Sequence, residues 1–102
     1  MNYSHAYSKL KLHNYTTIRR YRHGKKIFDV ETETLNGKVL HLSEIVGIKI
    51  KPLSQITDIL LLADTDCKTR KEAYALIQSF YEKPIDFEKE NFFIFYLRKI
   101  SL

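Results

Sequence analysis

The run of six apolar residues at 92–97, Phe-Phe-Ile-Phe-Tyr-Leu, restricts the fold of this chain more than any other feature. A strand that is half-buried alternates apolar and polar residues, and this run has no polar face. A strand without a polar face is buried on both sides, as in the middle of a sheet. We therefore expect residues 92–97 to form a central strand.

A β-hairpin is predicted around Asn36-Gly37, because both residues tolerate the positive φ angles of a tight two-residue turn. The first strand begins at 27–30 and continues through 31–34. The second strand places five apolar residues on one face at period two, and Glu44 with Gly47 indicates a bulge or bend in it. Those five residues are Leu40, Leu42, Val46, Ile48 and Ile50.

A pair of short helices is predicted between Pro52 and Pro84. Apolar residues recur at helical spacing over 53–63, and the turn at 64–66 ends that helix. Thr69 and Glu72 form a capping box for the second helix. Its apolar stripe is expected to dock on the sheet and consists of Ala73, Leu76, Ile77, Phe80 and Tyr81.

The order of strands, a helix pair and a returning strand predicts an α+β fold with a small, mostly antiparallel sheet that could close into a barrel. At 102 residues the chain is long enough for one core, so we expect a single domain at 9–102 after a loosely held arm at 1–8. The single cysteine, Cys67, excludes an internal disulfide and fits a reducing compartment. There is no apolar run of about 20 residues and no secretory signal, so we expect an intracellular protein without a membrane partner.

The basic residues are concentrated near the beginning of the chain. Of the 17 Lys and Arg, seven lie within residues 1–28, which contain no Asp or Glu; the other ten stand against all 12 acidic residues. The formal net charge of +5 is therefore a local positive field. Such a field beside Tyr and His side chains suits a phosphate-bearing partner, although a basic surface that only maintains solubility is the alternative.

Arg19 and Arg20 are the central candidates for a binding site. They alternate on a predicted strand, so one faces a cleft and the other solvent. The guanidinium fork suits bidentate contact with a phosphate or base, whereas a structural salt bridge of Arg19 with Asp29 or a Glu is the alternative. Tyr21 could stack on a base or flank the sheet core. The candidate nucleic-acid-binding residues are Thr16, Thr17, Arg19, Arg20, Tyr21, Arg22, Lys25 and Lys26.

No metal or cofactor site is predicted. The four His residues form no i, i+4 pair and have no companion Cys. Asp64 and Asp66 beside Cys67 are better explained by a helix-ending turn than by a cation loop. The three Gly residues form no phosphate-binding loop.

Several segments resemble the ASCH domains of the PUA-like superfamily, in the same order and spacing. They are the opening Thr-Thr-Ile-Arg-Arg at 16–20 with 26–30, the strand and short helix at 45–57, the helix at 70–81 and the strand at 92–97. Subgroups with this opening are similar to small proteins of archaea and their viruses. The resemblance implies a PUA-like pseudo-barrel of five or six strands with two short helices at one end. It also implies a cleft beside the 16–20 strand for RNA or modified nucleosides.

The resemblance also implies where catalysis is lost. Some members are hydrolases with a motif of Gly, Lys, Glu and Arg; aligned on Arg19, its Lys and Glu positions hold Asn14 and Thr17. Asn cannot titrate and Thr is a poor base, so the sequence predicts binding rather than catalysis.

Three functions remain after this comparison. The first is a non-catalytic module that binds nucleic acid, with RNA favoured, and the second is a protein-interaction or small-ligand module. A hydrolase of modified nucleosides is the weaker third. A nucleic-acid-binding protein should keep its basic residues exposed on one face, whereas basic residues that are scattered or paired with acids favour the second function. The oligomeric state does not follow from the sequence.

Overall fold

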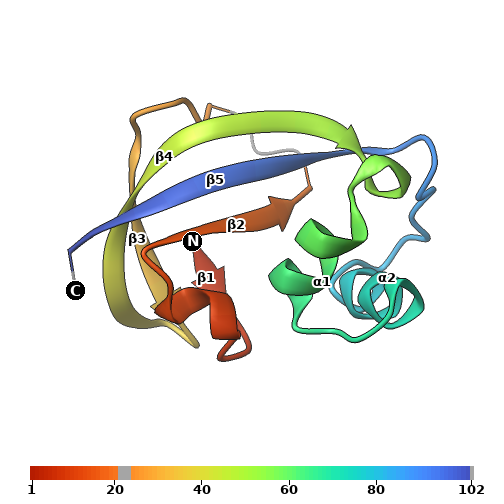
Figure 1. Cartoon of the computed structure of the whole chain (residues 1–102), viewed down its shortest axis with the longest axis horizontal. Helices are drawn as coiled ribbons and strands as arrows, with labels where there is room; N and C mark the ends of the chain where they lie inside the picture. The colour runs from red at the N-terminus through yellow and green to blue at the C-terminus, as the bar shows by residue number, and fades with distance from the viewer. Residues whose placement is uncertain (21–23, 102) are drawn as a thin grey trace.

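The computed structural model describes residues 1–20 and 24–101 and has an α+β fold. Five strands form one curled mixed sheet in the order β1-β3-β4-β5-β2, a half-barrel with α1 and α2 together at one end (Figure 1). Only the β1–β3 pair is parallel among the described pairs. The elements are β1 (Asn2–Tyr3), the 3-10 helix η1 (Ser8–Lys11), β2 (Asn14–Arg19), β3 (Val30–Leu35), β4 (Lys38–Pro52), the 3-10 helix η2 (Leu53–Gln55), α1 (Asp58–Thr65), α2 (Arg70–Ser79) and β5 (Asn91–Ser101).

The apolar run at 92–97 lies in β5, between β4 and β2, which confirms the prediction of a central strand. Phe92 and Ile94 are fully buried in a cluster with apolar residues of both helices. Phe93 and Phe95 belong to a second cluster on the other side of the strand, with residues of β1, η1, β2 and β4. Because β5 has a core on each face, the run needs no polar residue.

The hairpin at Asn36-Gly37 is also confirmed. These two residues alone separate β3 from β4, and their φ angles are 50° and 84°. The bulge predicted in β4 is present as a register shift between Ile45 and Gly47, and a second shift lies between Leu42 and Ser43. The predicted apolar face of β4 is only partly formed. Leu40 and Ile48 pack against the second core cluster, but the shifts turn other residues inward beside them.

The inward face of β4 is instead partly polar. His41, Ser43 and Ile45 are buried, whereas Val46 and Ile50 are 43% and 55% exposed. A period-two count cannot locate the inward face of a strand whose register shifts twice.

Half of the predicted capping box is present, because Thr69 Oγ1 accepts a hydrogen bond of 3.2 Å from the backbone N–H of Glu72. The Glu72 carboxylate accepts at 3.3 Å from the backbone N–H of Lys68 instead of that of Thr69. Ala73 and Ile77 are buried. Phe80 is 47% exposed, so its predicted place in the core is wrong. The helix ends at Ser79, and the chain turns at Phe80 before the stripe can continue.

Residues 1–8 are not the loose arm that we expected. Asn2 and Tyr3 pair with Thr34 and Leu35 of β3, and Tyr3 is 3% exposed. The backbone of β1 hydrogen-bonds to the outer edge of β3, which would otherwise be unpaired. Residues 1–8 are therefore held against the sheet. None of the helices in the described part of the chain is long and apolar enough to cross a membrane.

His41 gives the fold a testable response to acid. Its Nε2 lies 2.7 Å from the Tyr15 hydroxyl, and its side chain is buried. Burial, and then the positive charge of Lys99, lower the pKa of His41 below its usual 6.5, although Glu33 opposes them. The unfolded chain therefore binds more protons than the folded protein just below pH 6.5, and stability should fall as the pH decreases through that window.

The His41→Gln variant should lack this component of the acid response. The measurement is chemical denaturation between pH 7 and pH 5, with His13→Gln at an exposed position as the control. If wild type and His41→Gln lose stability equally over this range, His41 is not the group responsible.

Candidate ligand-binding pocket at Arg19

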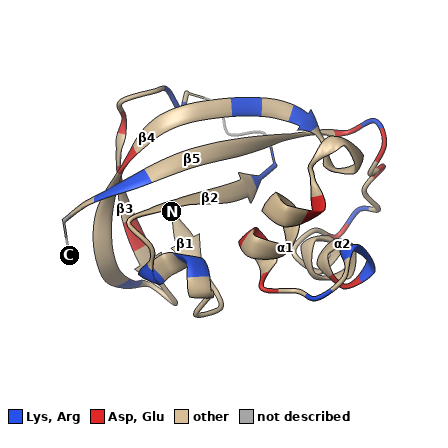
Figure 2. Cartoon of the chain, viewed as in Figure 1, with Lys and Arg blue, Asp and Glu red and all other residues tan. Residues whose placement is uncertain are grey.

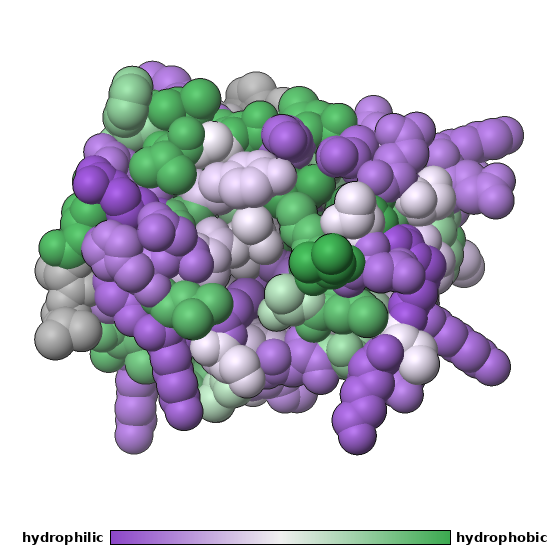
Figure 3. Space-filling model, in the orientation of Figure 1, coloured by the Kyte–Doolittle hydropathy of each residue, from purple (hydrophilic) through white to green (hydrophobic). Residues whose placement is uncertain are grey.

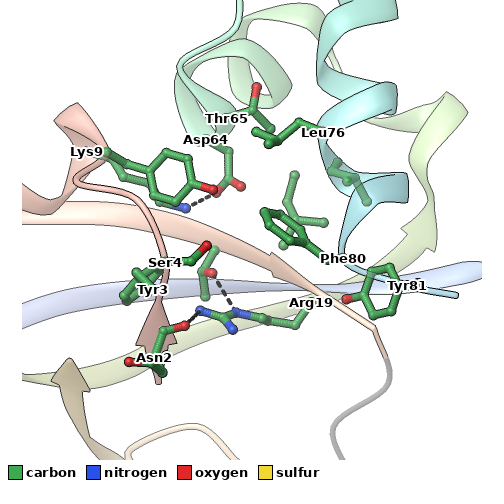
Figure 4. A pocket seen from close by; sticks show the side chains of 14 residues that line it. Asn2, Tyr3, Ser4, Lys9, Arg19, Asp64, Thr65, Leu76, Phe80 and Tyr81 are labelled. Atoms are coloured by element: carbon green, nitrogen blue, oxygen red, sulfur yellow. Dashed lines mark hydrogen bonds and ion pairs between the residues drawn. The ribbon is translucent and has the colours of Figure 1, made fainter. Parts of the chain in front are cut away.

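A cavity of about 330 Å³ lies where the N-terminal segment, β2 and the two helices meet (Figure 4). Its wall on the sheet side includes Thr17 and Arg19 from the end of β2. The opposite wall comes from the last residues of α1 and from the end of α2, including Asp64 and Phe80. The cavity therefore draws on segments that are far apart in the sequence.

Arg19 is the cation of this cavity. The β2–β5 register places Thr17 and Arg19 opposite Phe95 and Phe93, so both lie on the same face of β2. Arg19 Nε donates to Thr17 Oγ1 at 3.1 Å, and Nη2 donates to the carbonyl oxygen of Asn2 at 3.0 Å. The carbon at the centre of the guanidinium lies 4.8 Å from the centre of the Tyr3 ring.

These contacts hold the guanidinium in place without neutralising it. Within residues 1–20 and 24–101, no carboxylate lies within ion-pair distance of Arg19. The salt bridge with Asp29 or a Glu that we considered is absent from this part of the chain. The acceptors Thr17 and Asn2 engage Nε and Nη2, and the Tyr3 hydroxyl is a further neighbour of Arg19, which leaves N–H groups of the guanidinium to donate to a ligand.

The cavity also contains a buried ion pair. Lys9 Nζ lies 2.9 Å from Asp64 Oδ1, and the two residues are 5% and 6% exposed. Thr16 donates to the same oxygen at 3.0 Å. The Lys9 ammonium lies 5.4 Å and 5.2 Å from the ring centres of Tyr3 and Tyr7. Burial lowers the pKa of Lys9, while Asp64 acts in the opposite direction.

Sequence reasoning missed both members of this pair. Lys9 and Asp64 are separated by 55 positions, and no motif connects them. The sequence predicts that a turn at 64–66 ends the helix, but α1 continues through Asp64 to Thr65 and is capped at Asp66. Neither place in the chain reveals what the Asp64 side chain contacts. Buried Lys and Asp residues are rare and are almost always paired, so knowledge of their burial would have indicated a pair. Burial could not be predicted from the sequence at either position.

Aromatic side chains complete the cavity wall. Tyr7, Phe80 and Tyr81 all line it. Burial, and then the charge of Asp64, raise the pKa of Tyr7, so its hydroxyl stays protonated at neutral pH. Phe80, which is 47% exposed, is one of the lining residues, and its ring centre lies 6.2 Å from that of His5. These rings offer apolar surface for the body of a ligand.

The other basic candidates do not join Arg19. Arg20 forms a two-pronged ion pair with Glu90, with Nε and Nη2 donating at 2.6 Å and 2.9 Å. Lys25 is paired with Glu31 at 2.5 Å. Lys26 is exposed and its side chain has no partner within the described ranges. The Thr16 hydroxyl donates a hydrogen bond to Asp64, and the Thr17 hydroxyl accepts one from Arg19.

Tyr21 and Arg22 lie outside the described residues, so their predicted role stays untested. Elsewhere, Lys and Arg are spread over β4, β5, the loops and α2 (Figure 2). Hydrophobic side chains also reach the surface between hydrophilic ones on the face shown in Figure 3. Basic residues that are spread over several elements, or paired with acids, are what we expect of a small-ligand or protein-interaction module.

In the described ranges, no three His, Cys, Asp or Glu side chains come together in a way that could hold a metal ion. The cavity instead offers one unpaired cation, one carboxylate with a partner on a single oxygen, and aromatic surface. No protein-family model, no curated protein and no solved structure matches this chain.

Proposed function

We propose that the protein is a non-catalytic binding module whose pocket at Arg19 takes a small anionic ligand. The observation that carries this proposal is a guanidinium that lines a cavity and has no carboxylate partner in the described residues. Its two protein hydrogen bonds fix the fork, so a ligand does not have to order it. A volume of about 330 Å³ is at the small end of ligand pockets, which favours a compact molecule over a polymer.

Binding without catalysis is supported by the residues at the Glu and Lys positions of the ASCH-like motif. Thr17, at the Glu position of the ASCH-like motif, is occupied as the acceptor for Arg19 Nε. Asn14, at the Lys position, is exposed and cannot titrate. The PUA-like resemblance supports a ligand cleft beside the 16–20 strand, and the Arg19 cavity lies there. A PUA-like classification of the half-barrel is part of this proposal.

RNA binding remains a second candidate, supported by the net charge of +5 and by the unpaired side chains of Arg19 and Lys26. Five free cations would give a slope of log K against log salt of about −3 to −4 for a single strand. With Arg20 and Lys25 paired to acids, the three other basic candidates predict a slope of only about −2.1. The salt dependence of binding therefore measures how many basic residues take part.

The test replaces Arg19 by Gln and uses Arg98→Gln as the control, because both variants lose one positive charge. Arg98 is exposed, pairs with Glu44 and does not line the cavity. Calorimetry at low salt would measure the binding of benzoate, phenylacetate, phenylpropionate and phenyl phosphate, with a single-stranded RNA titrated in parallel. We expect Arg19→Gln to weaken the small anion that binds best by about tenfold or more, since hydrogen bonds to a charged group are worth about 1.5–3 kcal/mol.

Arg98→Gln should leave that affinity within about twofold. Equal losses in the two variants would mean that net charge, not the pocket, attracts the anion. If none of the four anions binds and RNA does, the nucleic-acid function replaces the small-ligand one.

A further inference from the structure

Asp64 contributes a second, unused anchor to the Arg19 cavity. Both protein donors, Lys9 Nζ and Thr16 Oγ1, reach Oδ1. No donor from the described residues reaches Oδ2, and this atom is not among the buried side-chain atoms that lack a partner, so it is open to solvent or a ligand. Asp64 is only 6% exposed and lines the cavity, so Oδ2 is reached from the cavity rather than from the outer surface.

The two anchors face the cavity from different walls. Asp64 comes from the end of α1 and Arg19 from the end of β2, and they lie on opposite sides of the opening in Figure 4. Phe80 and Tyr81 add aromatic surface to the same cavity. One end of the cavity thus offers hydrogen-bond donors with a positive charge, and the other offers an acceptor.

The charge of Lys9 decides which donor can meet Asp64. The ammonium lies 2.9 Å from Oδ1, so a second ammonium at Oδ2 would be placed beside a like charge. A neutral hydroxyl or amide N–H avoids that repulsion and still donates to the carboxylate.

We propose that the ligand is a small acid that carries a neutral hydrogen-bond donor at the end opposite its anionic group, with an apolar or aromatic body between them. The anion binds Arg19 and the donor binds Asp64 Oδ2. This inference rests on the proposed function, because it specifies the ligand of the same pocket. A phenol-bearing carboxylate is the simplest member of this class.

The hydrogen bond that the donor forms should affect the affinity of the ligand more than the added size of the donor group. A ligand without it closes the cavity over Oδ2 and leaves that oxygen with neither water nor a partner. Sites built around a hydrogen bond discriminate strongly against analogues that lack the donor. Because the ion pair with Lys9 already offsets part of the charge of Asp64, we expect a preference of about tenfold.

The experiment compares three pairs of acids that differ by one hydroxyl, on the wild-type protein. The pairs are benzoate and para-hydroxybenzoate, phenylacetate and para-hydroxyphenylacetate, and phenylpropionate and para-hydroxyphenylpropionate. Their increasing length covers different spans between the anchors. We expect the hydroxylated member to bind about tenfold more tightly in at least one pair, and tyramine, with an ammonium in place of the acid, to bind more weakly than any acid.

A double variant, Lys9→Met with Asp64→Leu, should bind the two members of that pair with equal affinity. If the acids bind but no pair shows a preference, this inference is wrong while the proposed function stands. A preference that persists in the double variant also overturns it, because the donor then binds elsewhere. If no acid binds, the proposed function itself fails. The wild-type comparison is decisive even if the double variant does not fold.

Discussion

Phe95→Ala is expected to lower the free energy of unfolding by about 3–5 kcal/mol, because Phe95 is fully buried in the core beside β5 and its removal leaves a cavity. Phe80→Ala removes the same side chain from a position that is 47% exposed. Full burial of a Phe contributes about 1.5–3 kcal/mol, so the loss at Phe80 should be about 1 kcal/mol. Urea denaturation of both variants measures the difference.

Phe80→Ala also serves as the control for the sequence-based expectation that Phe80 docks on the sheet. A cost as large as that of Phe95→Ala would mean that the second helix continues its apolar stripe into the core. The small cost that we expect would show that Phe80 lies outside the core, in keeping with its place in the cavity wall.

Asp64→Leu should lower the free energy of unfolding by about 3–5 kcal/mol at neutral pH, because it leaves the buried ammonium of Lys9 without its partner. The double variant Lys9→Met with Asp64→Leu should be much less destabilised, because neither charge remains. The difference between the single and double variants isolates the unpaired charge from changes in packing.

The cost of Asp64→Leu should diminish as the pH rises. Burial already lowers the pKa of Lys9 below its usual 10.5 in the wild-type protein, and loss of Asp64 removes the main opposing effect. Between the lowered folded pKa and 10.5 the unfolded chain binds more protons than the folded one, so stability increases with pH. The double variant lacks Lys9 and corrects for other groups that titrate. An equal pH response in the two variants would contradict this assignment.

Local signals made part of the fold predictable. The turn at Asn36-Gly37, the cap at Thr69 and the apolar run in β5 each depend on a few neighbouring residues, and each has the predicted structure. Their physical causes act over one turn or one strand, within the reach of a sequence pattern.

The rest of the site depends on pairings between distant residues. Lys9 and Asp64 are 55 positions apart, and Arg20 and Glu90 are 70 positions apart. The basic cluster looked continuous in the sequence because its acidic partners come from elsewhere in the chain. Only the folded arrangement separates Arg19, which has no acidic partner in the described part of the chain, from its paired neighbours.

Arginine side-chain NMR tests most directly whether Arg19 is the anion-binding group of the pocket. The side-chain Nε–Hε signals of the arginines can be followed by NMR while para-hydroxyphenylpropionate is added, with phenyl phosphate as a second anion. We expect the Arg19 signal to shift and to saturate with at least one of them, while the signals of Arg20 and Arg98, both paired with Glu, stay in place. An Arg19 signal that does not move, or arginine signals that all drift together without saturation, would contradict the role of Arg19 as the anion-binding group.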